Sequence, residues 1–310
     1  MKPTLLVLVK LLDSTLEIIR REYNLIYEYD PARRSQAIEE HAPQIQAVLT
    51  NGIVGLTAQE MQKMPRLELV CTVGAGYDRL DVDYAHAHGI VAANGAGTNA
   101  DCVADQAMAL LLGVVRHVVY LDRVCREGIW RTQVAMPTNV SGKKMGIIGL
   151  GTIGMQIAKR ALAFDMEISY HNRKQRQDVD FQFYDHVIDL AKWADYLVIS
   201  APGGAQTRHM VNAQVLEALG SKGFLVNVGR GEIVDTQALA YALRNKTIAG
   251  AGLDVYESEP EPPAELIGFD SLVITPHMAG WSPETILRSE ERFIKNARCH
   301  FAGKPVISPI

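Results

Sequence analysis

Three ionisable side chains follow predicted strand ends in the second half of the chain: Arg230, Glu259 and His277. The carboxyl ends of parallel strands meet at one edge of a sheet, where a doubly wound sheet binds its ligand. There a planar cation could hold the carboxylate of a keto acid, an imidazole could protonate its carbonyl oxygen, and an acid could orient that imidazole. The set therefore indicates hydride transfer to an anionic keto acid. Taken singly, each residue is also explained as a surface charge, a solvated acid or a histidine near a helix start.

The stretch KKMGIIGLGTIG in the middle of the chain has the pattern of a dinucleotide-binding turn. The apolar run Met145–Ile148 precedes G-x-G-x-x-G, and Met155–Phe164 repeats apolar residues at helical spacing. In this context Gly149 allows the tight turn, Gly151 lets the backbone approach a pyrophosphate, and Gly154 lets the helix pack on the strand. We therefore expect a nicotinamide dinucleotide here.

The residues after the next predicted strand indicate which dinucleotide is preferred. Domains that prefer NAD place an acid about 20 residues past the first glycine, on the ribose 2′-hydroxyl. Asn172 lies 172 − 149 = 23 positions past that glycine, and Arg173 and Lys174 follow, with Arg176 nearby. Cations suit the extra phosphate of NADP. We predict a preference for NADP(H), with NAD(H) as the alternative cofactor and a solvated basic turn as the alternative explanation.

Composition bounds the class of protein. A chain of 310 residues with 48% hydrophobic and 21% charged residues is typical of a soluble globular protein, here of two domains. The net charge of −4 argues against a nucleic-acid partner. The four cysteines have no metal-binding spacing, and the apolar run Ala107–Val115 is too short to cross a bilayer. We expect a cytoplasmic protein with neither a metal site nor a membrane partner.

Strand and helix patterns alternate along the chain, which predicts an α/β fold with two Rossmann-like domains and doubly wound parallel sheets. In the first half, strands are expected at Leu5–Val9, Ala47–Thr50, Leu69–Val73 and Ile90–Ala92. In the second half, six strands are expected, at Met145–Ile148, Glu167–Tyr170, Tyr196–Ser200, Phe224–Val228, Ile248–Leu253 and Leu272–Thr275. Helix starts are expected from Ser14 with Glu17, from Thr57 with Glu60, and at Ser282 before Pro283. One long helical pattern covers Ala100–Arg126.

A glycine turn, Gly74-Ala75-Gly76, follows the Leu69–Val73 strand. Small residues at a strand end expose backbone N–H groups that can bind a carboxylate. An ordinary turn explains the fragment equally well.

Over nearly its whole length the chain resembles the D-isomer-specific 2-hydroxyacid dehydrogenases. The resemblance is carried by GAGYDRLD (74–81), CVADQAMALLL (102–112), GKKMGIIGLGTIG (142–154), NVGRGEIVD (227–235), AGLDVYESEP (251–260), TPHMAG (275–280) and the closing GKPVISPI. The VAD at 103–105 and the closing motif look most like glyoxylate/hydroxypyruvate reductases and the related hydroxyphenylpyruvate reductases.

The resemblance implies residue roles. Arg230, Glu259 and His277 match the catalytic residues. Gly74, Ala75 and Gly76, with Arg230 and His277, match the substrate contacts, and Asp254 matches the acid that meets the nicotinamide carboxamide. The implied cofactor contacts are Gly149, Gly151, Thr152, Ile153, Gly154, Asn172, Arg173, Lys174, Ala201, Pro202, Thr207, Val228, Gly229, Arg230, Asp254, His277 and Gly280. The chain departs from common family patterns in Ala201-Pro202-Gly203-Gly204 and in Trp281.

The resemblance also implies an organisation and an activity. A discontinuous substrate domain (1–98 and 283–310) would flank a dinucleotide-binding domain (99–282), in a homodimer with the Ala100–Arg126 region at its interface. The expected activity is NADPH-dependent reduction of glyoxylate, hydroxypyruvate or a similar 2-keto acid to the D-2-hydroxy acid, with the proton from His277. A dinucleotide-sensing, corepressor-like binding protein with the same fold is the alternative.

Overall fold

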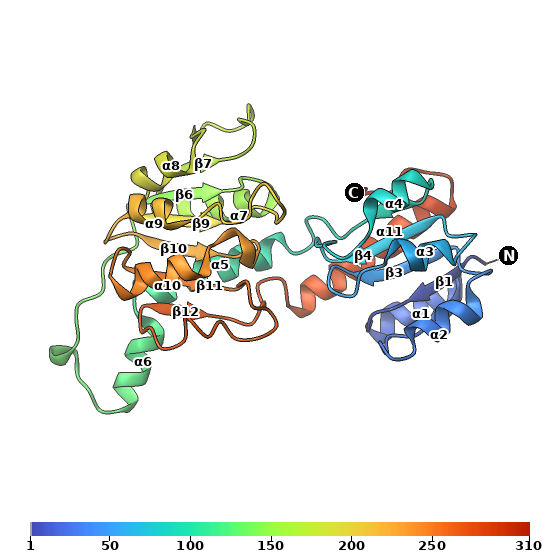
Figure 1. The fold of residues 1–310 in the computed structure, drawn as a ribbon, viewed down its shortest axis with the longest axis horizontal. Coiled ribbons are helices and arrows are strands. Elements are labelled where there is room, and N and C mark those ends of the chain that lie inside the picture. The colour runs from blue at the N-terminus through green and yellow to red at the C-terminus, as the bar shows by residue number, and fades with distance from the viewer. Residues whose placement is uncertain (1) are drawn as a thin grey trace. The chain divides into compact units, whose positions relative to one another are not determined.

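Two parallel sheets organise the computed structural model, which describes residues 2–310 (Figure 1). The chain folds into two compact units, one made of the residues up to Asn99 with Gly280–Ile310, the other of Ala100–Ala279. The boundaries expected from the sequence lie at 98/99 and 282/283. The predicted α/β class with two doubly wound sheets and a discontinuous first part is confirmed.

The first unit contains a five-stranded sheet in the order β2-β1-β3-β4-β5, with every neighbouring pair parallel. Its strands are β1 (Thr4–Val7), β2 (Asn24–Tyr27), β3 (Ala47–Asn51), β4 (Leu69–Val73) and β5 (Val91–Ala93). Its helices are α1 (Asp13–Glu22), α2 (Arg34–His41), α3 (Ala58–Gln62), α4 (Val82–Ala87) and α11 (Pro283–Phe301). The sequence did not predict β2, a short edge strand of which no residue is fully buried.

Helix α11 belongs to the first unit although it is far from the other helices in sequence. It begins as predicted, with Ser282 as N-cap and Pro283 in the first turn. Phe293, Ile294 and Ala297 are buried in the same core as β1 and β4. The first unit is therefore closed by residues from both ends of the chain.

The second unit contains a seven-stranded parallel sheet in the order β12-β11-β10-β9-β6-β7-β8. Its strands are β6 (Lys144–Ile148), β7 (Glu167–His171), β8 (Gln182–Phe183), β9 (Tyr196–Ile199), β10 (Phe224–Asn227), β11 (Gly250–Leu253) and β12 (Leu272–Ile274). Its helices are α5 (Ala100–Val115), α6 (Val118–Arg126), α7 (Thr152–Leu162), α8 (Val187–Trp193), α9 (Ala213–Leu219) and α10 (Thr236–Arg244), with single 3₁₀ turns at Arg131–Gln133 and Gly231–Ile233. The six predicted strands are present, and the two-residue edge strand β8 was not predicted. The strand order reverses between β6 and β9, and such a switch point opens a ligand crevice at the carboxyl ends of the strands.

The expected single helix over Ala100–Arg126 is instead two helices, so that prediction is wrong. Helices α5 and α6 meet at a bend of 55°. His117, between them, has left-handed backbone with φ of 53°. Helix α5 is mostly buried against β11, where Gly250 and Gly252 leave room: a Cβ on Gly252 would lie 3.0 Å from the Leu110 Cβ.

Among residues 2–310, no single helix has the length and apolar composition needed to cross a membrane, although the bent pair α5 and α6 meets that test when taken together.

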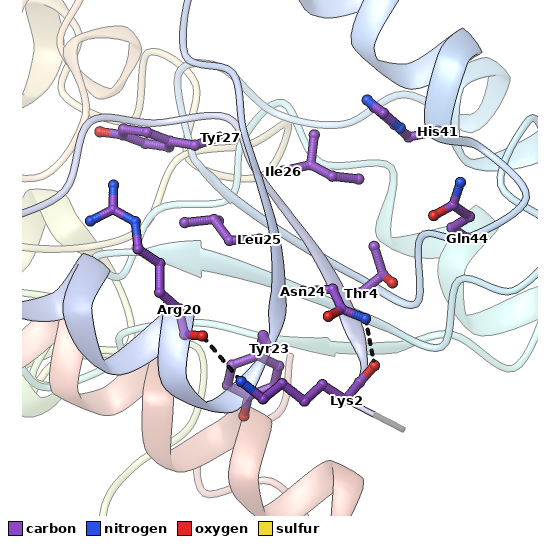
Figure 2. Close-up of a pocket in the computed structure, with 10 residues that line it drawn as sticks. All are labelled: Lys2, Thr4, Arg20, Tyr23, Asn24, Leu25, Ile26, Tyr27, His41 and Gln44. Carbon is purple, nitrogen blue, oxygen red and sulfur yellow. Dashed lines mark hydrogen bonds between the residues drawn. The ribbon is translucent and has the colours of Figure 1, made fainter.

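An open hollow of about 620 Å³ lies along β2 at the edge of the first unit (Figure 2). Lys2, Arg20 and His41 contribute side chains to its lining, together with the whole of β2. Two strands, β1 and β3, separate it from β4 and the glycine turn that follows β4. The hollow is therefore distinct from the site that the sequence predicts.

Candidate active site

Arg230, Glu259 and His277 all follow neighbouring strands of the second unit. Arg230 comes after β10, Glu259 after β11, and His277 after β12. These strands are adjacent and parallel, so their carboxyl ends share one edge of the sheet. Glu259 and Arg230 each influence the pKa of His277, which means that the three charges lie within electrostatic reach of one another.

His277 and Glu259 form a direct pair, with His277 Nδ1 at 2.7 Å from Glu259 Oε2. The other oxygen of Glu259 accepts a hydrogen bond from the Tyr256 N–H at 2.9 Å. The hydrogen bond that Glu259 accepts from the His277 ring raises the pKa of His277 above its ordinary value, against the opposing effect of burial. Burial would raise the pKa of Glu259, but its bonds with the His277 ring and the Tyr256 N–H lower it overall. The pair therefore favours an imidazolium beside a carboxylate.

Asp254 builds the turn that carries His277. This carboxylate is fully buried; Oδ1 accepts from the Thr275 hydroxyl at 2.5 Å and from the Met278 N–H at 2.8 Å, and Oδ2 accepts from the Ala279 N–H at 2.8 Å. The His277 N–H donates to the Asp254 carbonyl oxygen, and His277 holds a left-handed φ of 55°. Such backbone is unfavourable for a residue with a Cβ and persists only when its surroundings fix it. Asp254 thus fixes the direction of the His277 side chain, a role that the sequence did not reveal.

Asn227 organises the Arg230 turn in a similar way. Its buried side chain accepts from the Gly229 N–H at 3.0 Å and donates to the Arg230 carbonyl oxygen at 2.9 Å. Arg230 Nη1 donates to the Gly229 carbonyl oxygen at 2.9 Å. Val228, an expected cofactor contact, is buried in the core beneath this turn. Asn227 was visible in the NVGRG motif, but only its hydrogen bonds reveal the bracing role.

The glycine-rich turn has the geometry expected of a pyrophosphate site. Gly149 has a φ of 95°, and a Cβ on Gly154 would lie 2.4 Å from the Gly149 carbonyl oxygen, so α7 packs directly against the turn. A Cβ on Gly151 would meet nothing within 4 Å, which leaves open space beside the backbone. Within residues 2–310, three backbone N–H groups in the first turn of α7 donate no hydrogen bond, namely those of Thr152, Ile153 and Gly154. Free N–H groups at a helix start suit a phosphate.

Successive strand-end turns of the second unit touch through their backbones. A Cβ on Gly149 would lie 2.6 Å from the Ala201 N, and one on Gly229 would lie 2.6 Å from the Ala201 carbonyl oxygen. One on Gly231 would lie 2.2 Å from the Tyr256 carbonyl carbon. The turns after β6, β9, β10 and β11 therefore form one close-packed layer, and glycine is required wherever one backbone rests on the next.

The four polar residues expected near the adenosine ribose follow β7, and their side chains differ in what they contact. Asn172 Oδ1 accepts from the Leu150 N–H at 2.7 Å, so its amide braces the glycine turn. Arg176 forms an ion pair with Asp178 and donates to the Leu150 carbonyl oxygen. Arg173 and Lys174 are exposed and have no ion pair within residues 2–310.

The hydroxyl of Thr207 stabilises the turn after β9. Thr207 Oγ1 donates to the Pro202 carbonyl oxygen at 2.9 Å. Ser200 Oγ donates to the Gly149 carbonyl oxygen at 2.8 Å and joins this turn to the glycine-rich one. Ala201 is buried between them. The expected cofactor contacts Ala201, Pro202 and Thr207 therefore flank the crevice between β6 and β9.

The glycine turn after β4 lies in the first unit. Its backbone is supported from behind, where the Gly95 N–H donates to the Gly74 carbonyl oxygen at 2.6 Å and Asn94 donates to the Ala75 carbonyl oxygen at 2.9 Å. Within residues 2–310 the N–H groups of Ala75 and Gly76 donate no hydrogen bond. The turn therefore offers two backbone donors to an anion. Gly280, the other expected contact in this unit, rests against Asn99.

Comparisons with known proteins give a consistent result. Residues 108–279 match a family model described as the NAD binding domain of D-isomer specific 2-hydroxyacid dehydrogenases. The chain is 39% identical over 293 residues to a glyoxylate/hydroxypyruvate reductase A of Arabidopsis thaliana, covering 94% of each protein. It is 38% identical over 285 residues to a hydroxyphenylpyruvate reductase of Plectranthus scutellarioides, covering 92% of this chain and 91% of that protein. A solved NADPH-dependent glyoxylate/hydroxypyruvate reductase of Sinorhizobium meliloti, in complex with NADP and malonate, has a TM-score of 0.91 and 35% identity, covering 100% of this chain and 97% of the other.

Proposed function

Because the chain belongs to the D-isomer-specific 2-hydroxyacid dehydrogenase family, we propose that this oxidoreductase reduces a small 2-keto acid of the glyoxylate or hydroxypyruvate type. The product is the D-2-hydroxy acid, and NADPH is the preferred cofactor. The observation that carries the proposal is the 2.7 Å contact between His277 and Glu259 at the sheet edge that also carries Arg230. The similar proteins named above are reductases, and none supports the corepressor alternative.

His277 is suited to donate the proton. Glu259 occupies Nδ1, so Nε2 is the nitrogen left to face a substrate carbonyl oxygen, and the ring is 44% exposed. The carboxylate favours the imidazolium, whose Nε2–H donates as the alkoxide forms. When bound, the nicotinamide supplies the hydride.

Two features suit the substrate carboxylate. The planar guanidinium of Arg230 matches a carboxylate in a way that a lysine does not. The Ala75 and Gly76 N–H groups are backbone donors of the kind that bind anions. Both features favour an anionic substrate.

The cofactor preference rests on charge at the end of β7. Arg173 and Lys174 are exposed cations, whereas Arg176 is already paired with Asp178. No acid stands at position 172, and Asn172 is engaged with Leu150. Arg173 and Lys174 are therefore the proposed partners of the 2′-phosphate, and the Sinorhizobium meliloti relative is NADPH-dependent by name.

Steady-state kcat/KM with NADPH and NADH, on a panel of glyoxylate, hydroxypyruvate and hydroxyphenylpyruvate, tests the proposal. We expect higher values with NADPH, a reduced preference in Arg173→Ala, and partial reversal when Asn172→Asp is added. Lys222→Ala is the matched control, because Lys222 precedes β10 and lies at the opposite edge of the sheet. Equal or higher values with NADH would refute the cofactor preference, and no turnover of any keto acid would refute the activity.

The proposal also includes a homodimer and a cytoplasmic location. An apolar hollow of about 470 Å³ beside α6 is lined by Val118, Leu121, Ile129 and Trp130. Such a surface suits a second copy of the chain. The four cysteines are free thiols, which suits a reducing compartment.

A further inference from the structure

Glu232 makes a contact that neither the proposed catalysis nor the glycine motif explains. It lies in the 3₁₀ turn Gly231–Ile233, directly after Arg230. Its Oε1 accepts from the Gly204 N–H at 2.6 Å. A Cβ on Gly203 would lie 2.7 Å from the same oxygen. A short bond to a carboxylate is a strong one, so this side chain holds the Gly203–Gly204 peptide.

The same peptide lies against the side chain of Arg230. A Cβ on Gly203 would be 3.0 Å from Arg230 Cγ, so the loop rests on the aliphatic part of the arginine. The backbone of Glu232 adds a second link, because its carbonyl oxygen accepts from the His209 N–H at 2.8 Å. The segment between Gly203 and His209 is therefore fastened to the Arg230 turn at two places.

This segment also borders the dinucleotide crevice. It follows β9, which pairs with β6, and the glycine-rich turn follows β6. The strand order reverses between these two strands, where doubly wound sheets bind dinucleotides. Movement of Gly203–Gly204 would thus disturb both the dinucleotide crevice and the side chain of Arg230.

We propose that Glu232 is a positioning residue whose carboxylate sets the Gly203–Gly204 peptide for cofactor binding and, through that peptide, the side chain of Arg230 for substrate binding. The inference rests on the proposed function for the identity of the two ligands. It also explains the glycine at position 203, since a Cβ there would lie 2.7 Å from Glu232 Oε1 and 3.0 Å from Arg230 Cγ.

The test compares Glu232→Ala with Glu232→Gln, which keeps an oxygen acceptor. We expect Glu232→Ala to raise the NADPH dissociation constant, measured by fluorescence titration, and the KM of the keto acid by about tenfold each, with a smaller fall in kcat. Glu232→Gln should recover most of both losses. Glu217→Ala, an exposed acid on α9, should change neither.

Gly203→Ala disturbs the same contact from the other side and serves if Glu232→Ala does not fold. It should raise both constants, and adding Glu232→Ala should cost less than the sum of the two single changes. Parent-like constants in Gly203→Ala, or in a folded Glu232→Ala, would overturn the proposal. The NADPH titration needs no turnover, so it decides the role of Glu232 even if the keto acid panel refutes the proposed reaction.

Discussion

At the scale of single residues, the protonation of His277 depends on opposing influences. The hydrogen bond to Glu259 and the charges of Glu259 and Asp254 raise its pKa, whereas burial and the charge of Arg230 lower it, and the net effect is upward. Reduction consumes a proton from the imidazolium, so activity should be high below the raised pKa and lost as pH rises through it. On the acid side, activity should fall when Glu259 becomes protonated. Because the pKa of Glu259 is lowered, this fall should occur at a pH below the ordinary pKa of a glutamate.

The first prediction concerns His277→Ala, which should lower kcat by about 10²-fold or more while NADPH affinity changes little. In Glu259→Gln, the alkaline limb of the kcat/KM profile should move to lower pH, because the main cause of the raised pKa is gone. His209 pairs with Glu257 at the same distance of 2.7 Å and gives the matched control. His209→Ala should leave the alkaline midpoint of the profile in place. A His277→Ala enzyme with the parent kcat would exclude this proton donor.

The motifs carry the identity of site residues but not their supports. Arg230, Glu259 and His277 could be selected because they follow strands and match family motifs. The bracing roles of Asn227, Asp254 and Glu232 could not be predicted, because each role depends on hydrogen bonds to turns whose folded geometry the sequence does not give.

At the scale of elements, local signals predicted local structure well. The capping box of Thr57 and Glu60 forms as predicted. The expected box of Ser14 and Glu17 is wrong: α1 begins at Asp13, and no side chain of its own caps it. Glu290 of α11 accepts from the Leu12 N–H at 3.1 Å instead. A partner 278 residues away is beyond any local pattern.

Edge strands and bends were missed for related reasons. Strands β2 and β8 are short and contain no fully buried residue, whereas the central strands β9 and β10 are continuous buried runs. The bend at His117 has neither a proline nor a glycine to mark it. Tertiary packing decides these features, so the local pattern of 100–126 predicts one continuous helix.

The second prediction follows from the burial of Glu290, which is 1% exposed. Burial raises the pKa of this acid, against the bonds from Thr15 and Leu12, so the folded state binds its proton more tightly than the unfolded state does. The free energy of unfolding should therefore fall as pH rises from the ordinary value near 4.5 through the raised one. Glu290→Gln keeps an acceptor for the Leu12 N–H, does not titrate, and should remove this part of the pH dependence.

Urea unfolding at a series of pH values measures the effect. The exposed neighbour in Glu291→Gln is the control and should keep the parent slope. Glu290→Ala leaves the Leu12 N–H and the Thr15 hydroxyl without this acceptor and should lose about 1–3 kcal/mol at every pH. An unchanged pH slope in Glu290→Gln would contradict the prediction.

At the scale of the whole molecule, the exposed apolar residues around α6 indicate a protein–protein interface. Helix α6 and the segment after it stand away from the seven-stranded sheet (Figure 1). Val119 is 58% exposed, Trp130 66% and Met136 96%. Exposed apolar surface of this kind marks an interaction site, for which we propose the second copy of the chain.

The third prediction is that Val119→Asp with Trp130→Asp converts a dimer to a monomer, because charges in an apolar interface lose their hydration without compensation. Light scattering coupled to gel filtration gives the mass directly. Ile267→Asp, at an apolar residue 61% exposed elsewhere in the second unit, should stay dimeric. A parent protein with the mass of one chain would refute the homodimer itself.

The closure of the first unit by α11 has a consequence for synthesis. Phe293, Ile294 and Ala297 complete its core, Glu290 holds the start of α1, and Pro309 bridges to Ala93 on β5. A nascent chain emerges from its N-terminus, so the residues of β1 to β5 leave the ribosome long before the helix that covers them. The second unit, which is continuous in sequence, can finish folding in that interval. We therefore expect the first sheet to be made to be the last to be completed, with the apolar face that α11 covers exposed until that helix has been synthesised.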